Sequence, residues 1–388
     1  MNLHPHHHHH KVYWPATGAQ THRPRHSKTT PAAAASPDTA MERATMALAF
    51  LLAALAASAG ANPVNKSCVT GSAGASVSIG YGGAGASAGA GVSLDADCPR
   101  AEEIVRAAVE QAVAADPRMA ASLLRLHFHD CFVNGCDGSV LLDDKPFFVG
   151  EKTAGPNINS LRGFEVIDAI KAELEQECPE TVSCADVLAI AARDSVVASG
   201  GPSWEVETGR KDSRTASLQA ANSNLPAPTS GVATLVQKFT NVGLIAKDMV
   251  ALSGAHTIGK ARCTTFSARL ASVGESAKDT GFLQSLQQLC AGSAGSALAH
   301  LDLATPATFD NQYYINLLSG DGLLPSDQAL AAPAGSGAED VAALVADYAF
   351  DAALFFDDFA ASMLRMGRLA PAGGRDAGEV RRNCRVVN

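Results

Sequence analysis

Several features are scarce in this chain of 388 residues, and each scarcity narrows the choice of structure and function. Few segments alternate between apolar and polar residues with period two, so a protein built mainly of β-sheet is not expected. The apolar stretch within residues 41–61 is about a dozen residues long, which is too short to predict a membrane span. Basic residues are outnumbered, with 30 Lys and Arg against 39 Asp and Glu, which argues against non-specific binding to nucleic acid.

The first 93 residues divide into three segments by composition. Residues 41–61 combine an early positive charge, an apolar stretch and small residues at the end, which is typical of a secretory signal peptide. Residues 1–40 precede the expected start at Met41 and are interpreted as a non-native upstream extension. Residues 62–93 are rich in Gly, Ala and Ser, which predicts a flexible lead-in with a weak glycosylation sequon at Asn65. The remaining residues, 94–388, are expected to form one domain.

Removal of the signal peptide and the segment before it would make the protein more acidic. Residues 1–61 contain five basic and two acidic residues, so the formal net charge would change from −9 to −12. We expect such a protein to act on small neutral molecules or to meet cationic wall components, rather than to bind nucleic acid.

The domain shows apolar positions at helical spacing in several places, which predicts a mainly α fold. Breaks that contain Pro or Gly follow three of the stripes, at Asp116-Pro117, Gly200-Gly201-Pro202 and Gly243. These stripes are interpreted as faces that point into the core. They lie at residues 104–113, 161–174, 184–198, 232–239 and 355–366.

Histidine is scarce outside the N-terminal segment, because eight of the 12 His residues lie within the first 26 positions. The other four are His127, His129, His256 and His300. His129 follows Arg125 by four residues in a helical pattern, so the two side chains should lie on one face. A fixed cation beside a neutral imidazole can transfer protons and stabilise charge. His127 should point to the opposite side of the helix, which argues against a zinc site shared with His129.

Two longer motifs surround these histidines. Residues 125–139 read RLHFHDCFVNGCDGS, and residues 252–259 read LSGAHTIG. They resemble the distal and proximal haem motifs of the plant secretory (class III) haem peroxidases, and the resemblance extends from about Leu94 to the end of the chain. It implies a mainly α haem peroxidase fold in which distal and proximal helical halves sandwich haem b.

On the distal side of the haem, the resemblance implies that His129 takes a proton from H₂O₂ and delivers it to the leaving oxygen. Asn157 would hold the His129 imidazole by a hydrogen bond. Arg125 would stabilise the negative charge that develops as the O–O bond breaks. Phe128, which flanks the same helix surface, would contact the haem.

On the proximal side, the resemblance implies that His256 binds the haem iron. Asp327 would accept the other ring N–H of His256 and so increase the basicity of the imidazole. Pro226 resembles the proline that positions small phenolic substrates at the exposed haem edge. From spacing alone, His256 would more often be a core residue and Asp327 a surface acid.

Two sets of oxygen atoms are implied to bind structural Ca²⁺, which takes roughly six to eight oxygen ligands. From the pattern alone, residues 302–310 would more often form a solvated loop. The distal set comprises Asp130, the carbonyls of Val133 and Gly135, Asp137 and Ser139, with Glu151 linked through water. The proximal set comprises Thr257, Asp302, Thr305, Thr308 and Asp310.

Nine cysteines in a chain with a signal peptide predict an oxidising compartment and a disulfide framework. Eight cysteines permit about 105 pairings, so the sequence by itself does not connect them. The resemblance implies the pairs Cys98–Cys178, Cys131–Cys136, Cys184–Cys384 and Cys263–Cys290. Cys68, in the lead-in, is left over.

The leading interpretation is a secreted, monomeric haem peroxidase that reduces H₂O₂ and oxidises phenolic donors, such as lignin and cell-wall phenolics or donors in oxidative stress. The chain ends soon after Cys384, which favours the apoplast over the vacuole. A non-catalytic cell-wall binding protein with the same fold would be expected to lack Arg125, His129 or His256, and all three are present. A metal-dependent hydrolase would need a metal triad, and none is apparent in the sequence.

Overall fold

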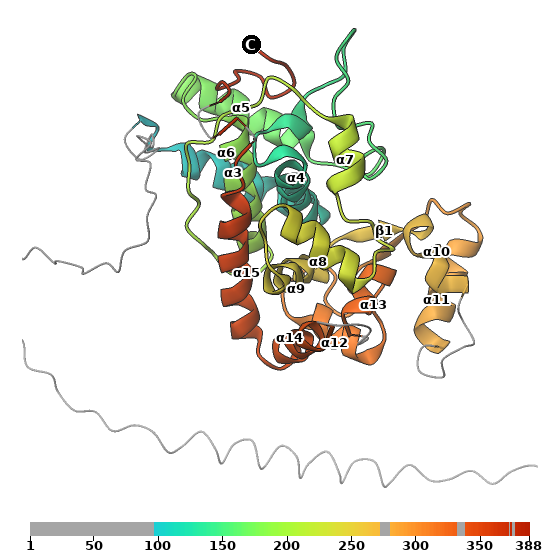
Figure 1. Ribbon diagram of the computed structural model, residues 1–388. Coiled ribbons are helices and arrows are strands. Elements are labelled where there is room, and N and C mark those ends of the chain that lie inside the picture. Colours follow the sequence, from blue (N-terminus) through green and yellow to red (C-terminus); the bar gives the residue numbers. More distant parts are fainter. Residues whose placement is uncertain (1–96, 272–279, 332–337, 372, 375–376) are drawn as a thin grey trace, which may run out of the picture. The chain divides into compact units, whose positions relative to one another are not determined.

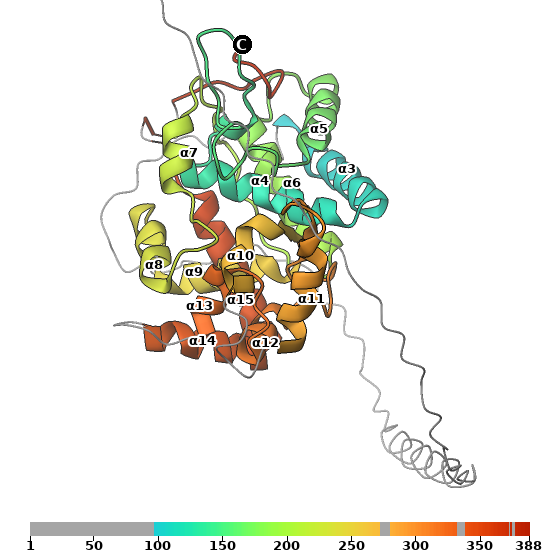
Figure 2. The ribbon, with the colours of Figure 1, turned by 90° about the vertical axis from the view of Figure 1, so that its right-hand side faces the viewer.

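The computed structural model describes residues 97–271, 280–331, 338–371, 373–374 and 377–388 (Figure 1). The expected upstream extension, signal peptide and lead-in, with Asn65 and Cys68, lie outside the described residues. The described part is mainly helical, as the sequence predicts, and its helices form two groups that both views separate (Figures 1 and 2).

The first group contains the helices on either side of the distal motif. They are α3 (Ala101–Ala115), α4 (Arg118–Asn134), α5 (Phe164–Glu177), α6 (Cys184–Ala198) and α7 (Leu218–Asn224). Helix α6 lies at the centre of this group, because it is apolar around most of its circumference and is buried from Cys184 to Val196. Its first turn is capped by Ser183, whose hydroxyl accepts a hydrogen bond from Asp186 N at 3.1 Å.

The apolar stripe expected from residue 161 begins as a helix only at Phe164. Gly163, the residue before it, has φ of +92°, a conformation that favours glycine. A Cβ at this position would lie 3.1 Å from Leu123 Cδ2, so the backbone here passes close to α4. Leu161 therefore precedes the helix and is not part of its first turn.

The second group carries the proximal motif. It contains α8 (Val232–Asn241), α9 (Ala246–Ser253), the 3₁₀ turn η2 (Gly254–Thr257), α12 (Gln312–Ser319), α13 (Pro325–Ala331) and α14 (Ala338–Phe350). The buried Tyr314 joins α12 to α9, because its hydroxyl donates to the carbonyl of Val250 at 2.9 Å. Helix α15 (Ala352–Gly367) passes along both groups and contacts α4 as well as α9 (Figure 1).

A small side unit extends from the second group. Strands β1 (Lys260–Arg262) and β2 (Leu298–His300) pair antiparallel, with Ala261 opposite Ala299. Between them in sequence lie α10 (Cys263–Ala271) and α11 (Thr280–Ala291), which the Cys263–Cys290 disulfide joins.

Four disulfides tie the described part of the chain together, and they are the pairs that the resemblance implies. They are Cys98–Cys178, Cys131–Cys136, Cys184–Cys384 and Cys263–Cys290. Among the described helices, none combines the length and the apolar character required to span a bilayer.

Candidate active site

His129 lies in α4 and is held in one tautomer by a chain of hydrogen bonds. Asn157 Nδ2 donates to the carbonyl of Glu151 at 2.9 Å, so the Oδ1 atom of Asn157 must face the histidine. That Oδ1 lies 2.6 Å from His129 Nδ1, which therefore carries the proton. On the other side of the ring, Arg125 Nε donates to His129 Nε2 at 3.0 Å. The Nε2 atom is thus the acceptor that the expected role in proton transfer requires.

The environment of His129 favours the neutral imidazole. Burial lowers its pKa well below the usual value, and the neighbouring Arg125 lowers it further, whereas the Asn157 hydrogen bond acts in the opposite direction. A neutral ring is able to accept a proton at physiological pH.

Arg125 stays close to His129 because the segment after Asn157 holds its guanidinium. The Nη1 atom donates to the carbonyl of Ser160 at 3.1 Å, and Nη2 donates to the carbonyl of Pro156 at 2.9 Å and to Ser160 Oγ at 3.2 Å. Burial lowers the pKa of Arg125 to about 10, so the side chain remains a cation at neutral pH. Phe128 is half-buried beside this pair, with its ring edge-on to His129 at 5.7 Å.

His256 lies in η2, directly after α9. Its Nδ1 lies 2.8 Å from Oδ1 of Asp327, which is in the first turn of α13. The same carboxylate accepts hydrogen bonds from Tyr313 OH at 3.1 Å and from Leu324 N at 3.3 Å. Because Asp327 accepts a hydrogen bond from Nδ1–H, the Nε2 atom of His256 carries no proton and is available as a ligand atom. The side chain keeps 40 % of its surface accessible.

Electrostatic effects connect the proximal and distal groups. Burial acts to lower the pKa of His256, but the Asp327 carboxylate outweighs it, so the pKa is raised overall. The positive charge of Arg125 acts on the same imidazole in the opposite direction, because it disfavours the protonated ring. The residues thus supply a basic imidazole at His256, and a neutral imidazole beside a cation at His129 and Arg125. This donor set fits a haem with one axial histidine.

The expected distal calcium residues lie around the end of α4 and the turn η1 (Ser139–Leu141), and their carboxylates are buried. Burial raises the pKa of Asp130 well above its usual range, and Asp137 raises it further. Burial also raises the pKa of Glu151 to about 7. Ser139 Oγ and Glu151 Oε2 find no hydrogen-bond partner among the residues that the structure describes. Clustered buried carboxylates beside unpaired oxygens fit a bound cation.

Two of the expected distal carbonyls lie at the same loop. The carbonyl of Val133 accepts a hydrogen bond from Asn224 Nδ2 at 3.0 Å, and Gly135 has φ of +94° at the end of α4. The Cys131–Cys136 disulfide closes this turn.

Four of the five expected proximal calcium residues are linked by hydrogen bonds. The Thr257 hydroxyl donates to Asp310 Oδ1 at 3.0 Å and lies 3.4 Å from Asp302 Oδ2. The Thr305 hydroxyl lies 3.1 Å from Asp302 Oδ2 and 3.2 Å from Asp310 Oδ1. Thr308 is exposed, and its backbone N–H donates to the carbonyl of Thr305.

His127 takes no part in either set of ligands. It is buried on the far side of α4 from Arg125 and packs against the disulfide, with Nδ1 3.6 Å from Cys131 Sγ. His127, Cys131 and Cys136 lie close enough together to suggest a metal site. Both sulfur atoms are already bonded to each other, so they are not thiolate ligands.

Pro226 is half-buried in the segment that follows α7. The carbonyl of Pro228, two residues later, accepts a hydrogen bond from Ser326 N at 2.9 Å. The segment therefore lies beside the start of α13, which carries Asp327.

Two residues of the site were missed by sequence reasoning. Ser160 holds Arg125 from 35 positions away, and Tyr313 holds Asp327 from 14 positions away. Each of them lies in a different segment from its partner, Ser160 before α5 and Tyr313 in α12, so no local pattern points to them.

The chain is similar to known peroxidases over most of its length. A family model described as peroxidase matches residues 105–351. The chain is 62% identical over 297 residues to Peroxidase 40 of Arabidopsis thaliana, a match that covers 75% of this chain and 83% of the relative. It is 53% identical to Peroxidase 9 of Arabidopsis thaliana (75% and 85% covered) and 50% identical to Peroxidase P7 of Brassica rapa subsp. rapa (75% and 97% covered). Together with the paired histidines, these matches show that the chain belongs to the plant secretory (class III) haem peroxidase family and is a peroxidase.

Proposed function

We propose that this peroxidase binds haem b between His256 and His129, reduces H₂O₂ to water there and oxidises small phenolic donors in one-electron steps. The proposal includes a secreted, monomeric protein that acts on cell-wall phenolics, among them lignin precursors. The observation that carries it is the fixed tautomer of both histidines, each with Nδ1 held by an oxygen and Nε2 left as an acceptor or ligand atom.

On the proximal side, His256 Nε2 would hold the haem iron, and Asp327 would keep the imidazole oriented and electron-rich. Haem, when bound, supplies the redox chemistry that cleaves the O–O bond and accepts electrons from the donor. Tyr313 supports this arrangement because it fixes the Asp327 carboxylate from the other side.

On the distal side, His129 Nε2 would take a proton from H₂O₂ and return it to the leaving oxygen. In the structure that nitrogen accepts a hydrogen bond from Arg125 Nε, so peroxide must replace this donor. The displaced Nε–H of Arg125 is then available to the oxygen on which negative charge develops. Asn157 keeps Nδ1 protonated, so the exchanged proton moves only at Nε2.

We further propose that the two oxygen clusters bind one Ca²⁺ each. The distal site would use Asp130, Asp137 and Ser139, with carbonyls of Val133 and Gly135 and a water-mediated link to Glu151. Unpaired Ser139 Oγ and Glu151 Oε2 support it. The proximal site would use Thr257, Asp302, Thr305, Thr308 and Asp310. Secretion is supported by the signal-peptide pattern and by four disulfides, which persist in oxidising compartments.

The test is an absorption spectrum of the haem- and calcium-loaded protein before and after one equivalent of H₂O₂. We expect a ferric Soret band that shifts on addition of peroxide and returns when guaiacol is added. Correctly folded protein that bound no haem, or a Soret band that peroxide left unchanged, would contradict the proposal. Gel filtration of the same sample tests the monomer.

A further inference from the structure

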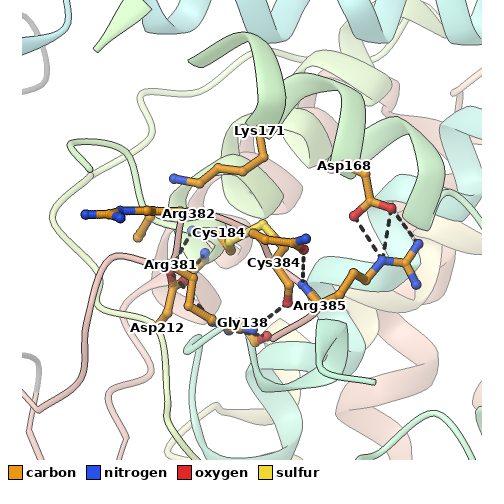
Figure 3. Close-up of a disulfide and its surroundings, with 12 residues drawn as sticks. Gly138, Asp168, Lys171, Cys184, Asp212, Arg381, Arg382, Cys384 and Arg385 are labelled. Atoms are coloured by element: carbon orange, nitrogen blue, oxygen red, sulfur yellow. Dashed lines mark hydrogen bonds and ion pairs between the residues drawn. A yellow bond between two sulfur atoms is a disulfide. The ribbon is translucent and has the colours of Figure 1, made fainter. Parts of the chain in front are cut away.

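The last residues of the chain contain a buried cation that the proposed reaction does not use. Arg381 is completely buried, and it lies beside the Cys184–Cys384 disulfide (Figure 3). Its Nη2 donates to the carbonyl of Gly138 at 2.6 Å and lies 3.5 Å from the carbonyl of Asp137. Its Nη1 donates to the carbonyl of Cys384 at 2.6 Å. One guanidinium therefore joins the C-terminal tail to the loop that would bind the distal calcium.

Asp212 balances this charge and ties a third segment to the same point. Its Oδ2 accepts hydrogen bonds from the backbone N–H of Arg381 at 2.8 Å and of Cys184 at 3.0 Å. The Arg381 Nε atom lies 3.9 Å from the same oxygen. Next to it, Ser213 N donates to the carbonyl of Asp137 at 2.7 Å. Arg381 and Asp212 are both fully buried, so the acid provides a charge of opposite sign beside the cation.

The loop backbone fits closely against these partners. Gly138 has φ of +67°, and a Cβ on it would lie 2.7 Å from Arg381 Nη2. At the other end of the loop, a Cβ on Gly135 would lie 2.6 Å from the backbone carbon of Ala370. Cys136 N also donates to the carbonyl of Leu369 at 3.0 Å. The loop is therefore held between two parts of the C-terminal region, one after α15 and one at Arg381.

From these contacts we infer that Arg381 is a positioning residue for the distal calcium loop, and that docking of the C-terminal tail and binding of Ca²⁺ at the distal site favour each other. This inference rests on the proposed distal calcium site. Arg381 does not contact the side-chain oxygens of Asp137 and Ser139 that would bind Ca²⁺. It contacts the backbone carbonyls of Asp137 and Gly138, which lie between those two side chains in the loop. Linkage is reciprocal, so bound Ca²⁺ must also stabilise the docked tail.

Geometry and charge make opposite predictions for the removal of Arg381. If the cation mainly repelled Ca²⁺, its loss would strengthen calcium binding. If the guanidinium mainly fixes the loop, its loss would weaken binding, and Lys would replace it only in part because one ammonium group cannot reproduce the planar fork of donors. The hydrogen bonds from Arg381 to the carbonyls of Gly138 and Cys384 favour the second outcome, because they hold the loop and the tail directly.

The experiment is a calcium titration by calorimetry on the haem-loaded, EGTA-treated protein. Arg381→Gln should weaken one calcium-binding event by about 10- to 100-fold, the usual effect of losing a residue that orients metal ligands. Arg381→Lys should lie between this variant and the wild type. Asp137→Asn identifies the affected event as the distal one. Arg385→Gln is the matched control, because it removes another cation of the same tail, with its pairs to Asp168 and Asp143, but keeps the hydrogen bond from Arg381 to Gly138. It should weaken calcium binding less than Arg381→Gln does (Figure 3).

The outcomes separate this inference from the proposed function. If the distal site of Arg381→Gln binds Ca²⁺ as tightly as that of the wild type, or more tightly, the proposed role of Arg381 is wrong. The proposed calcium site itself would then remain supported by the wild-type titration. If the wild-type protein shows no calcium-binding event that Asp137→Asn removes, both the proposed distal site and the inference are wrong. If the variants do not fold, hydrogen exchange of the wild type decides: Ca²⁺ should slow exchange at the Arg381 amide, and an unchanged rate would overturn the linkage.

Discussion

Asp327 Oδ1 lies 2.8 Å from His256 Nδ1, and 71 positions separate the two residues in sequence. This contact joins η2 to the first turn of α13. Because the same oxygen also accepts the Tyr313 hydroxyl, the carboxylate has little freedom to turn away from the imidazole. The orientation and the basicity of His256 therefore depend on a side chain from a different helix.

The Asp327→Asn variant should still bind haem but should react more slowly. The amide keeps the shape of the side chain and loses the negative charge that raises the pKa of His256. We expect the rate of guaiacol oxidation to fall by about 10- to 100-fold and the reduction potential of the haem iron to rise. Tyr313→Phe, which removes one hydrogen bond to the same carboxylate, should have a smaller effect. A variant with the wild-type rate and potential would contradict the proposed role of Asp327.

His129→Leu should slow the reaction with H₂O₂ by about 10²- to 10⁴-fold, because no other base replaces Nε2. The measurement is the stopped-flow rate of the Soret change as a function of peroxide concentration. His127→Gln is the matched control, since His127 lies in the same helix and is equally buried but faces the Cys131–Cys136 disulfide. If the two variants slowed the reaction equally, the effect would be one of helix packing and not of proton transfer.

Asn157→Val should slow the reaction with H₂O₂, but less than His129→Leu does. The change removes the acceptor that lies 2.6 Å from His129 Nδ1, so the imidazole is free to rotate and to adopt the other tautomer. We expect the peroxide reaction to slow by about tenfold or more, because general-base catalysis requires the correct protonation site. The wild-type rate in this variant would show that Arg125 alone orients the ring.

Calcium should stabilise the protein more at pH 8 than at pH 5. Without the metal, burial raises the pKa of Glu151 from 4.5 to about 7. The contribution of Glu151 to the free energy of unfolding is fully present below about pH 4.5 and is lost as the pH rises through about 7. The cause is that burial disfavours the ionised carboxylate in the folded protein. Asp130 acts in the same direction. Bound Ca²⁺ compensates for the ionised carboxylates, so its binding releases protons.

The check is the melting temperature with Ca²⁺ and with EGTA at both pH values. Glu151→Gln should flatten the pH dependence of the EGTA curve. A calcium effect that was the same at pH 5 and pH 8 would show that the carboxylates do not titrate in this range.

Much of the architecture could be predicted from the sequence, because local patterns determine it. The stripe at residues 184–198 matches α6 at both ends, since Ser183 caps its start and glycines follow its end. The predicted start of α5 was one turn too early. Gly163 has a left-handed backbone conformation and packs against α4, and this tertiary contact leaves no local pattern in the sequence. The family resemblance named most residues that the site brings together. It did not reveal Ser160, Tyr313 or Arg381, whose partners lie far away in sequence.

The Cys184–Cys384 disulfide spans 200 residues, and it closes within five residues of the C-terminus. During synthesis, the N-terminal helices can begin to pack while the rest of the chain is still being made. The loop at Gly138, however, lacks its Arg381 donor until 243 further residues have been made. A growing chain can thus form α4 before the neighbouring loop gains this contact. A truncation that removed Arg381 would therefore leave the loop without this contact, whatever the integrity of the catalytic motifs.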